Sequence, residues 1–435
     1  MKRKMLFVLM MLATTKIWSQ EKPLVFTGAT ILPVNGMPIP KGVMIVQYGK
    51  ILVVGDEKTT IPADAELRDV TGKTIMPGLI DTHSHLGGPE GGDGSNPINP
   101  EARVLDAINP TSDGFKKALA GGITTINVMP GSGHLMSGQT VYLKMREGRI
   151  IEDLLITNEK GVYGGLKMAN GTNSIRNGNG FPGTRAKSAS LVRELFLKAQ
   201  EYKKKIEKAG KDSTKMPERD LRMEPLVEVL NGKRVVHFHT HKSNDILTAI
   251  RLSKEFGFRI VLHHLSEGWK VADEIAKAGV ACSIINIEAP GGKMEAVNLT
   301  LETGAVLEKA GVPVVFHTDD GITDSRLFLR TAALSVREGM SRQKALEGLT
   351  ITGAKLIDLS TRIGSLEKGK DADFIILSGD PFSVYTKVEQ TWVEGIKRYD
   401  ISNQADKAFL TGGYGVYNYD RGEYHQHGDE EEDRQ

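Results

Sequence analysis

The stretch that decides the fold runs from Lys73 to His85 and reads KTIMPGLIDTHSH. It begins with a short apolar, β-rich run and ends in a polar cluster that contains His83 and His85. Side chains two residues apart in a strand point the same way, so the two imidazoles can chelate one ion together. On its own such a pair is a weak motif, because two solvent-facing histidines in a loop would look alike. The rest of the chain decides between these interpretations.

Seven further β-rich segments follow, most of them separated by stretches long enough for a helix. They are GITTINVM (122–129), TVYLKM (140–145), GGLKMA (164–169), KRVVHFH (233–239), FRIVLHH (258–264), VACSII (280–285) and VPVVFHT (312–318). Eight strands that alternate with helices are typical of an α/β protein with a parallel (β/α)8 TIM-like barrel, which we predict for residues 73–361. In such barrels the active site lies at the carboxyl ends of the strands.

The two ends of the chain follow a different pattern, with brief β-rich runs broken by Gly, Pro and Asp. We expect residues 20–72 and 362–402 to meet in one composite β-sandwich beside the barrel. Residues 1–19 combine a basic start with a short apolar run, which predicts a signal peptide and a secreted or periplasmic protein. That run is too short to span a bilayer, so we expect no membrane span after cleavage. Residues 403–435 are predicted to be a polar, acidic tail.

Composition excludes several classes of protein and of site. The 435 residues include 56 Lys+Arg and 54 Asp+Glu, a net charge of +2, so we expect no nucleic-acid partner. The single cysteine, Cys282, permits neither an internal disulfide nor a thiolate zinc site, which leaves histidines and carboxylates for any metal. The sequence leaves a homo-oligomeric assembly open.

Histidines concentrate at the ends of four predicted strands. Of the eleven in the chain, nine precede the tail, and eight of those nine lie at these ends. They are His83 and His85, then His237, His239 and His241, then His263 and His264, and finally His317, with Asp319 two residues further on. Because the carboxyl ends of parallel strands converge on one rim, four weak local signals become one joint signal for a metal centre.

With these residues in place, the chain resembles the amidohydrolase superfamily, and is most similar to its imidazolonepropionase-like and prolidase-like members. The resemblance rests on PGLIDTHSH (77–85), the histidine strands, HTD (317–319) and the closing GSLEKGKDAD (364–373). It implies a metal-dependent hydrolase that cleaves an amide C–N bond in a small substrate. An N-acyl amino acid, a dipeptide or a cyclic amide would be such a substrate.

The resemblance also implies the site residues and the cofactor. Matched by position, the metal ligands are His83, His85, Lys167, His239, His264 and Asp319, for one or two divalent ions, with zinc expected. A metal of this kind lowers the pKa of bound water from 15.7 to about 7. Asp319 would act as general acid and base, and His241 would contact the developing oxyanion. Lys167 stands where many relatives carry a carboxylated lysine between two metals, and a lysine in an internal salt bridge is the alternative.

Three points stay open at this stage. His239 and His241 are two residues apart and point to the same side of a strand, so alternation along the strand does not tell which of them is the ligand. His263 and His264 face opposite ways in an extended strand, so at most one of them reaches the ion. Members of the family carry Gly-Glu-Asn shortly after the fourth strand, whereas residues 170–173 read NGTN and hold no carboxylate. This departure leaves the number of metals open.

Two other classes of function compete with the metallohydrolase. A secreted ligand-binding protein on a catalytically decayed barrel would contain no bound zinc or manganese. A sugar- or peptide-processing barrel with paired carboxylates would be insensitive to chelators. The insertions at 87–110 and 170–183 follow barrel strands and are expected to shape the pocket. Arg176, Arg185 and His134 are candidates for substrate contact, although each is also compatible with a purely structural place.

Overall fold

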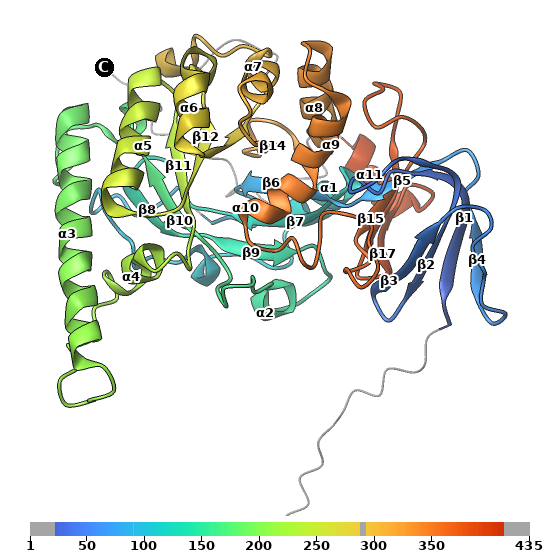
Figure 1. The fold of residues 1–435 in the computed structure, drawn as a ribbon, viewed down its shortest axis with the longest axis horizontal. Helices are drawn as coiled ribbons and strands as arrows, with labels where there is room; N and C mark the ends of the chain where they lie inside the picture. The colour runs from blue at the N-terminus through green and yellow to red at the C-terminus, as the bar shows by residue number, and fades with distance from the viewer. Residues whose placement is uncertain (1–21, 90, 288–292, 413–435) are drawn as a thin grey trace, which may run out of the picture.

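The structure is a computed structural model that describes residues 22–89, 91–287 and 293–412. The predicted signal peptide (1–19) and residues 413–435 of the predicted tail therefore lie outside the described residues. Figure 1 shows a small β-rich part at one end of the molecule and a larger part of strands and helices beside it.

The small part is one sheet built from both ends of the chain. Its strands are β1 (Leu24–Ile31), β2 (Ile39–Gln47), β3 (Lys50–Gly55), β4 (Glu66–Asp69) and β5 (Thr74–Pro77), with β15 (Phe374–Leu377), β16 (Val388–Val393) and β17 (Ile396–Asp400). They follow the order β17-β16-β15-β5-β1-β2-β3, and β4 pairs with β1. Hydrogen bonds join all eight strands, and the composite β-sandwich stays a prediction. The rings of Phe26, Phe374 and Trp392, which project from three strands of the sheet, pack against one another edge to face or stacked, with centroids 5.0–5.5 Å apart.

The larger part contains two sheets. The first consists of β6 (Leu79–Ser84), β7 (Ile123–Val128) and β9 (Val141–Lys144). The second has the order β14-β13-β12-β11-β10-β8, with β8 (Met136–Gln139), β10 (Leu166–Ala169), β11 (Val236–Thr240), β12 (Ile260–His264), β13 (Ala281–Ile284) and β14 (Val314–Phe316). Each of the eight segments predicted to be strands contains at least part of a strand, and the first contains both β5 and β6.

Strand direction departs from the prediction at the third segment. Strands β10 to β14 are parallel neighbours, as are β6 and β7. In contrast, β9 runs antiparallel to β7 and β8 runs antiparallel to β10, so the expectation of eight parallel strands was wrong here. The reason is the connection: a parallel partner needs a long crossover, usually a helix, and no helix separates β7 from β9 in the described chain.

The two sheets meet where β14 returns to β6. Beyond the end of β14, the backbone N–H of Asp319 donates to the carbonyl of His83 at 3.0 Å. The hydroxyl of Thr82 on β6 donates to the carbonyl of Phe316 at 3.3 Å. These contacts bring the histidines of β6 next to those that follow the other strands, although the ladders of the described residues do not close into one ring.

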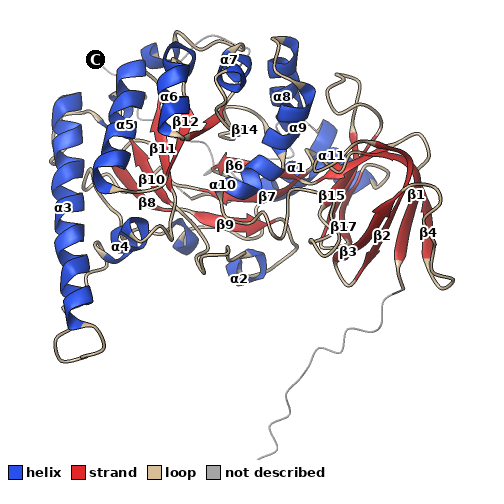
Figure 2. Ribbon diagram, viewed as in Figure 1, coloured by secondary structure: helices blue, strands red, loops and turns tan. Residues whose placement is uncertain are grey.

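Helices cover the outer side of the strands, as Figure 2 shows for α5 to α8. The helices are α1 (Asp113–Ala120), α2 (Ile151–Leu154), α3 (Arg185–Ala209), α4 (Glu224–Leu230), α5 (Ser243–Phe256), α6 (Ala272–Ala278), α7 (Thr303–Lys309), α8 (Phe328–Arg337), α9 (Arg342–Leu349), α10 (Ile351–Leu356) and α11 (Gln404–Thr411). Short 3-10 turns are η1 (Val104–Asp106), η2 (Thr172–Ser174), η3 (Gly268–Val271), η4 (Met294–Ala296) and η5 (Ser325–Leu327). Within the described ranges, none of the helices is both long and apolar enough to cross a membrane.

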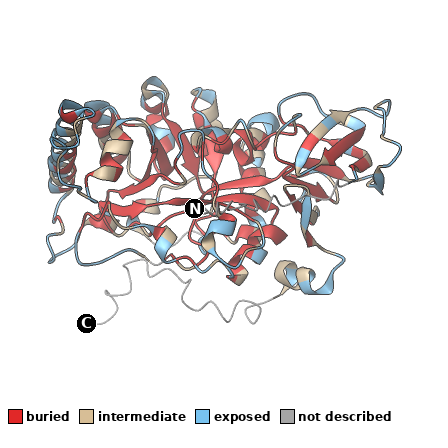
Figure 3. Cartoon of the chain, turned by 90° about the horizontal axis from the view of Figure 1, so that it is seen from below, coloured by how far each residue is buried: buried red, intermediate tan, exposed pale blue. Residues whose placement is uncertain are grey.

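Helix α5 illustrates how sequence spacing places these helices. Ile246, Ala249, Ile250 and Phe256 are buried, at the spacing of one helical face. Gly257 ends the helix in the left-handed conformation, with φ 72°, which glycine adopts without a Cβ clash. Figure 3 shows the resulting layering, with buried strands at the centre and exposed surface on the outer helices.

Part of the predicted tail is ordered structure. Residues Gln404–Thr411 form α11, and the side chain of Asn403 caps it by accepting the N–H of Ala405 at 2.9 Å. The helix lies against α1 and β17. Of the residues predicted as a polar, acidic tail, the structure describes 403–412, and these include this helix.

A buried ion-pair cluster joins the small sheet to the larger part. Lys144 on β9 is fully buried and pairs with Asp371, with Asp373 at 2.9 Å and with Glu394 at 3.4 Å. Burial alone would lower the pKa of Lys144, but the three carboxylates outweigh it and raise that pKa above its usual value. We call Lys144, Asp371, Asp373 and Glu394 the joint cluster. The closing motif GSLEKGKDAD thus serves to attach the small sheet.

Candidate metal centre

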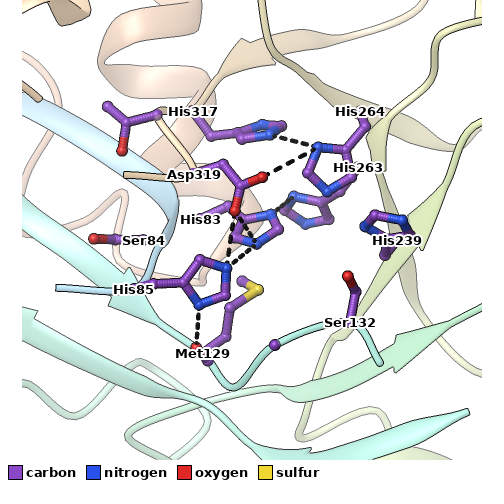
Figure 4. A network of polar contacts seen from close by, with 12 residues as sticks. His83, Ser84, His85, Met129, Ser132, His239, His263, His264, His317 and Asp319 are labelled. Carbon is purple, nitrogen blue, oxygen red and sulfur yellow. Dashed lines mark hydrogen bonds and ion pairs between the residues drawn. The ribbon is translucent and has the colours of Figure 1, made fainter. Parts of the chain in front are cut away.

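The first pair of histidines ends strand β6 and faces a carboxylate. The Nε2 atoms of His83 and His85 lie 3.1 Å apart, and both approach Asp319 Oδ1, at 3.4 and 2.8 Å (Figure 4). His85 Nδ1 lies 2.7 Å from the carbonyl of Met129, which can only accept, so this nitrogen carries the proton. His85 Nε2 therefore presents a lone pair toward Asp319 and His83.

Asp81 forms hydrogen bonds to the end of β6 and to the segment that follows β14. Its carboxylate accepts the backbone N–H groups of His83 and Thr318, each at 3.1 Å. Burial raises the pKa of Asp81 to about 7, although these hydrogen bonds and that of the Thr318 hydroxyl favour the ionised form. The backbone φ of Asp319 is 49° and that of His264 is 74°, values that residues other than glycine adopt rarely and mostly at functional sites.

Two more histidines approach the same space with unpaired nitrogens. His239 ends β11 and His264 ends β12, and both are buried. Among the described residues, His239 Nδ1 and His264 Nε2 have no hydrogen-bond partner. A buried polar atom left unpaired costs about 1–3 kcal/mol. Because His83, His264 and Asp319 also offer ligand atoms within 4.8 Å of one another, this set of nitrogens and a carboxylate fits a divalent cation such as zinc.

Lys167 lies inside this group of side chains. It projects from β10, is fully buried, and its Nζ lies 3.0 Å from His83 Nε2 and 3.1 Å from Met129 Sδ. Burial lowers the pKa of Lys167 to about 7, despite the opposing charge of Asp319. A substantial neutral fraction of the amine at pH 7 follows, and a neutral amine is the form that reacts with electrophiles.

His241 lies beside the group rather than within it. Its Nδ1 is 2.8 Å from Ser266 Oγ, and its ring stacks on that of His264 with centroids 5.1 Å apart. It is 8% exposed, more than any of the other seven strand-end histidines. His241 is therefore the strand-end histidine closest to solvent, where a substrate would approach.

Three further histidines pack beneath the group. His263 Nδ1 lies 3.3 Å from His83 Nδ1, and His263 Nε2 lies 3.0 Å from His237 Nδ1. His317 Nε2 lies 3.1 Å from His264 Nδ1. The expectation that His263 and His264 face opposite sides assumed an extended strand, but the positive φ of His264 bends the chain so that both rings join one cluster. His83, His263 and His317 form a second set whose ligand atoms lie within 4.8 Å.

The loop after β10 reaches the centre through an amide. Asn173 Nδ2 donates to His239 Nε2 at 3.2 Å and to Ser132 Oγ at 2.7 Å. Glu295, from another segment, accepts the backbone N–H of Thr172 in this loop at 2.7 Å. Glu295 follows β13 at a distance in sequence that no local motif could reveal.

The two arginines considered for substrate contact differ in their surroundings. Arg185 donates to Glu295 at 2.7 Å and to Asp245 at 2.9 Å, so carboxylates of the protein already engage it. Arg176 is exposed and lies over the ring of Phe181 at 3.7 Å from the centroid. Its Nη2 is 3.2 Å from His134 Nε2, and burial together with this cation lowers the pKa of His134 to about 4.

Comparison with known proteins places the chain in a family. The model of the amidohydrolase family matches residues 74–403, and the chain therefore belongs to that family. It is accordingly a hydrolase of the class that acts on carbon–nitrogen bonds.

Three relatives show how far the likeness extends. The crystal structure of an amidohydrolase from Thermotoga maritima is 34% identical, with a TM-score of 0.81, over 87% of this chain and 100% of that one. Amidohydrolase tasK of Hapsidospora irregularis is 26% identical over 82% of this chain, which spans only 40% of the length of tasK. Imidazolonepropionase of Thermoplasma volcanium is 22% identical over 79% of this chain and 86% of its own.

Proposed function

We propose that this protein is a metal-dependent amidohydrolase that cleaves an amide C–N bond in a small substrate, namely an N-acyl amino acid, a dipeptide or a cyclic amide. The observation that carries the proposal is the pair of buried, unpartnered nitrogens, His239 Nδ1 and His264 Nε2, beside His83, His85 and Asp319. We further propose that the two sheets of the larger part act together as a distorted (β/α)8 barrel, with this centre at the carboxyl ends of its strands.

The ligands of the proposed centre are His83, His85, His239, His264 and Asp319, from the ends of four strands. Lys167, on a fifth strand, would become a further ligand for a second ion if its amine were carboxylated. A divalent cation, for which we propose zinc, supplies Lewis acidity to water and to the substrate carbonyl. The burial of all six side chains keeps bulk water from competing for them.

The remaining chemistry belongs to residues of the chain. Asp319 accepts the proton of the attacking water and passes it to the departing nitrogen, as general base and then general acid. His241, at the solvent side of the group, donates a hydrogen bond to the carbonyl oxygen as negative charge develops on it. Arg176 is the cation that we assign to a substrate carboxylate, because Arg185 is held by Asp245 and Glu295.

Metal analysis combined with a substrate panel tests the proposal. The purified full chain is analysed for bound metals, stripped with a chelator, reloaded, and assayed on N-acyl amino acids, Xaa-Pro and other dipeptides, and cyclic amides. Bound zinc and turnover that disappears and returns with the metal are expected. Protein without metal or turnover would instead favour the ligand-binding alternative, and turnover that survives chelation would favour a metal-free hydrolase.

Export is the second part of the proposal. The basic start and apolar run of residues 1–19 support a signal peptide and a secreted or periplasmic location. Amino-terminal sequencing of protein from the extracytoplasmic fraction should begin near Gln20. A product that still begins at Met1 in the cytoplasmic fraction would contradict it.

A further inference from the structure

We propose that Thr82, Ser283 and His317 form a hydrogen-bonded row that orients His264 so that its Nε2 is the metal-binding atom. This inference rests on the proposed metal centre and adds three positioning residues to it. The row joins three strands: Thr82 lies in β6, Ser283 in β13, and His317 directly after β14. The side chains of all three are fully buried, so water does not interrupt the row.

The contacts of the row are continuous. His264 Nδ1 lies 3.1 Å from His317 Nε2, and His317 Nδ1 lies 2.8 Å from Ser283 Oγ. Ser283 Oγ lies 2.8 Å from Thr82 Oγ1, and the Thr82 hydroxyl donates to the carbonyl of Phe316 at 3.3 Å. Three of these contacts lie within 3.1 Å, and the contact from Thr82 to the Phe316 carbonyl is longer, at 3.3 Å.

The carbonyl at the far end sets that direction. A backbone carbonyl can only accept, so Thr82 gives its single proton to Phe316 and must accept from Ser283. Ser283 then has no proton left for His317, so His317 Nδ1 is the donor and His317 Nε2 holds the lone pair. That lone pair accepts the Nδ1 proton of His264, which leaves His264 Nε2 as a lone pair.

The opposite direction leaves the row unsatisfied at both ends. The Phe316 carbonyl would lose its donor, and His264 Nε2–H would be a buried donor without an acceptor among the described residues. The inferred direction instead leaves His264 Nε2 as a lone pair, which the proposed cation would engage.

The same row removes His317 from the alternative ligand set. Both ring nitrogens of His317 are engaged, one as donor to Ser283 and one as acceptor from His264. The set of His83, His263 and His317 therefore lacks one free ligand atom, although its nitrogens are close enough together. Of the two sets found among the described residues, this leaves His83, His264 and Asp319 as the one that we assign to the ion.

Two substitutions at position 317 separate hydrogen bonding from packing. In His317→Gln the amide oxygen can accept from His264 and the amide nitrogen can donate to Ser283, so the direction of the row is kept. In His317→Leu a side chain of comparable size can do neither. Ser283→Ala removes the acceptor of His317 while leaving both rings in place.

The experiment measures zinc affinity by competition with a chromophoric chelator, in the full-length protein and each variant. We expect His317→Leu to bind zinc about 10–100-fold more weakly, as loss of a group that orients a ligand commonly causes. We expect His317→Gln to stay close to wild type and Ser283→Ala to fall between them. The melting temperatures of the metal-free proteins report any general loss of structure.

The outcomes distinguish the row from the proposed function. Unchanged zinc affinity in His317→Leu would overturn the row, and so would an equal loss of affinity in both position-317 variants. In either case, zinc binding by the wild-type protein would still support the metal centre. If His317→Leu fails to fold, a Ser283→Ala variant that binds zinc as tightly as wild type would overturn the row instead. A wild-type protein that binds no divalent ion would overturn the proposed function and the row together.

Discussion

The joint cluster and the metal centre are both buried groups of ionisable side chains, but they are completed in different ways. In the joint cluster, Lys144 faces three carboxylates, and each of these has a cation within ion-pair distance. In the metal centre, one carboxylate faces several neutral histidines, and nitrogens of His239 and His264 are left without partners among the described residues. Each carboxylate of the first group has a cation of the chain as its partner, whereas the two nitrogens of the second group have no partner among the described residues.

The difference shows which buried polar groups hold a fold together and which await a ligand. Burial of a charge is tolerated when a partner and hydrogen bonds compensate for lost water. The joint cluster meets this condition, so its motif is explained by attachment of the small sheet. The metal centre does not meet it within the described residues, and the proposed cation would supply the missing partner.

The largest expected effect is the loss of turnover in Asp319→Asn. An amide cannot relay the proton, so the rate should fall by about 10²–10⁴-fold while the fold and the metal are retained. The measurements are the turnover number on the best substrate, the zinc content and the melting temperature. Asp320→Asn is the matched control, because this neighbouring carboxylate pairs with Lys117 at 2.8 Å. Normal turnover in Asp319→Asn would end the proposed role.

The next effect concerns stability, through Lys144→Met. Removing the lysine leaves the buried carboxylate of Asp373 without its cation, while Asp371 and Glu394 keep arginine partners, and the broken buried pair should cost about 3–5 kcal/mol of unfolding free energy. Denaturant unfolding measures this change, and zinc affinity of the folded variant should match wild type. Lys50→Met is the control, since Lys50 pairs with the same Asp371 but its side chain is 46% exposed, and about 1 kcal/mol or less is expected. Equal losses in the two variants would contradict the comparison.

The smallest effect is the stabilisation that a metal gives to the second group. Zinc at about one hundred times its dissociation constant should add about 2.7 kcal/mol to the unfolding free energy. Thermal unfolding with and without the metal measures this shift in wild type and in Lys144→Met. A similar shift in both proteins is expected because the joint cluster is complete without the ion. A melting temperature that does not respond to zinc in either protein would place the binding elsewhere or nowhere.

Much of the site was predictable because it depends on local spacing. Alternation along a strand placed His83 and His85 together, and the position of Asp319 after a β-rich run placed it at the same rim, where the structure brings all three together. The strand segments were likewise predictable from β-branched runs. The antiparallel direction of β9 was not, since it depends on the connection rather than on the strand itself.

The remaining features depend on contacts between distant segments. Glu295 accepts a hydrogen bond from the loop at Thr172, more than one hundred residues away in sequence. The residues around Glu295 contain no motif that predicts this contact. The role of His317 depends on which partners its two nitrogens meet, and strand parity says nothing of hydrogen-bond direction. For His317, the sequence indicated only that it lies two residues before Asp319, at the end of a predicted strand. The positive φ of His264 likewise follows from the packed strand end and not from its residue type.

The pairing of β5 with β15 has a consequence for biosynthesis. Thr74–Pro77 emerges from the ribosome early, but its partner Phe374–Leu377 is made only some three hundred residues later. Until then one edge of an apolar sheet has no neighbour, and unpaired edges invite association with other chains. Prematurely terminated chains should therefore aggregate, and completion of the small sheet is a late step in folding.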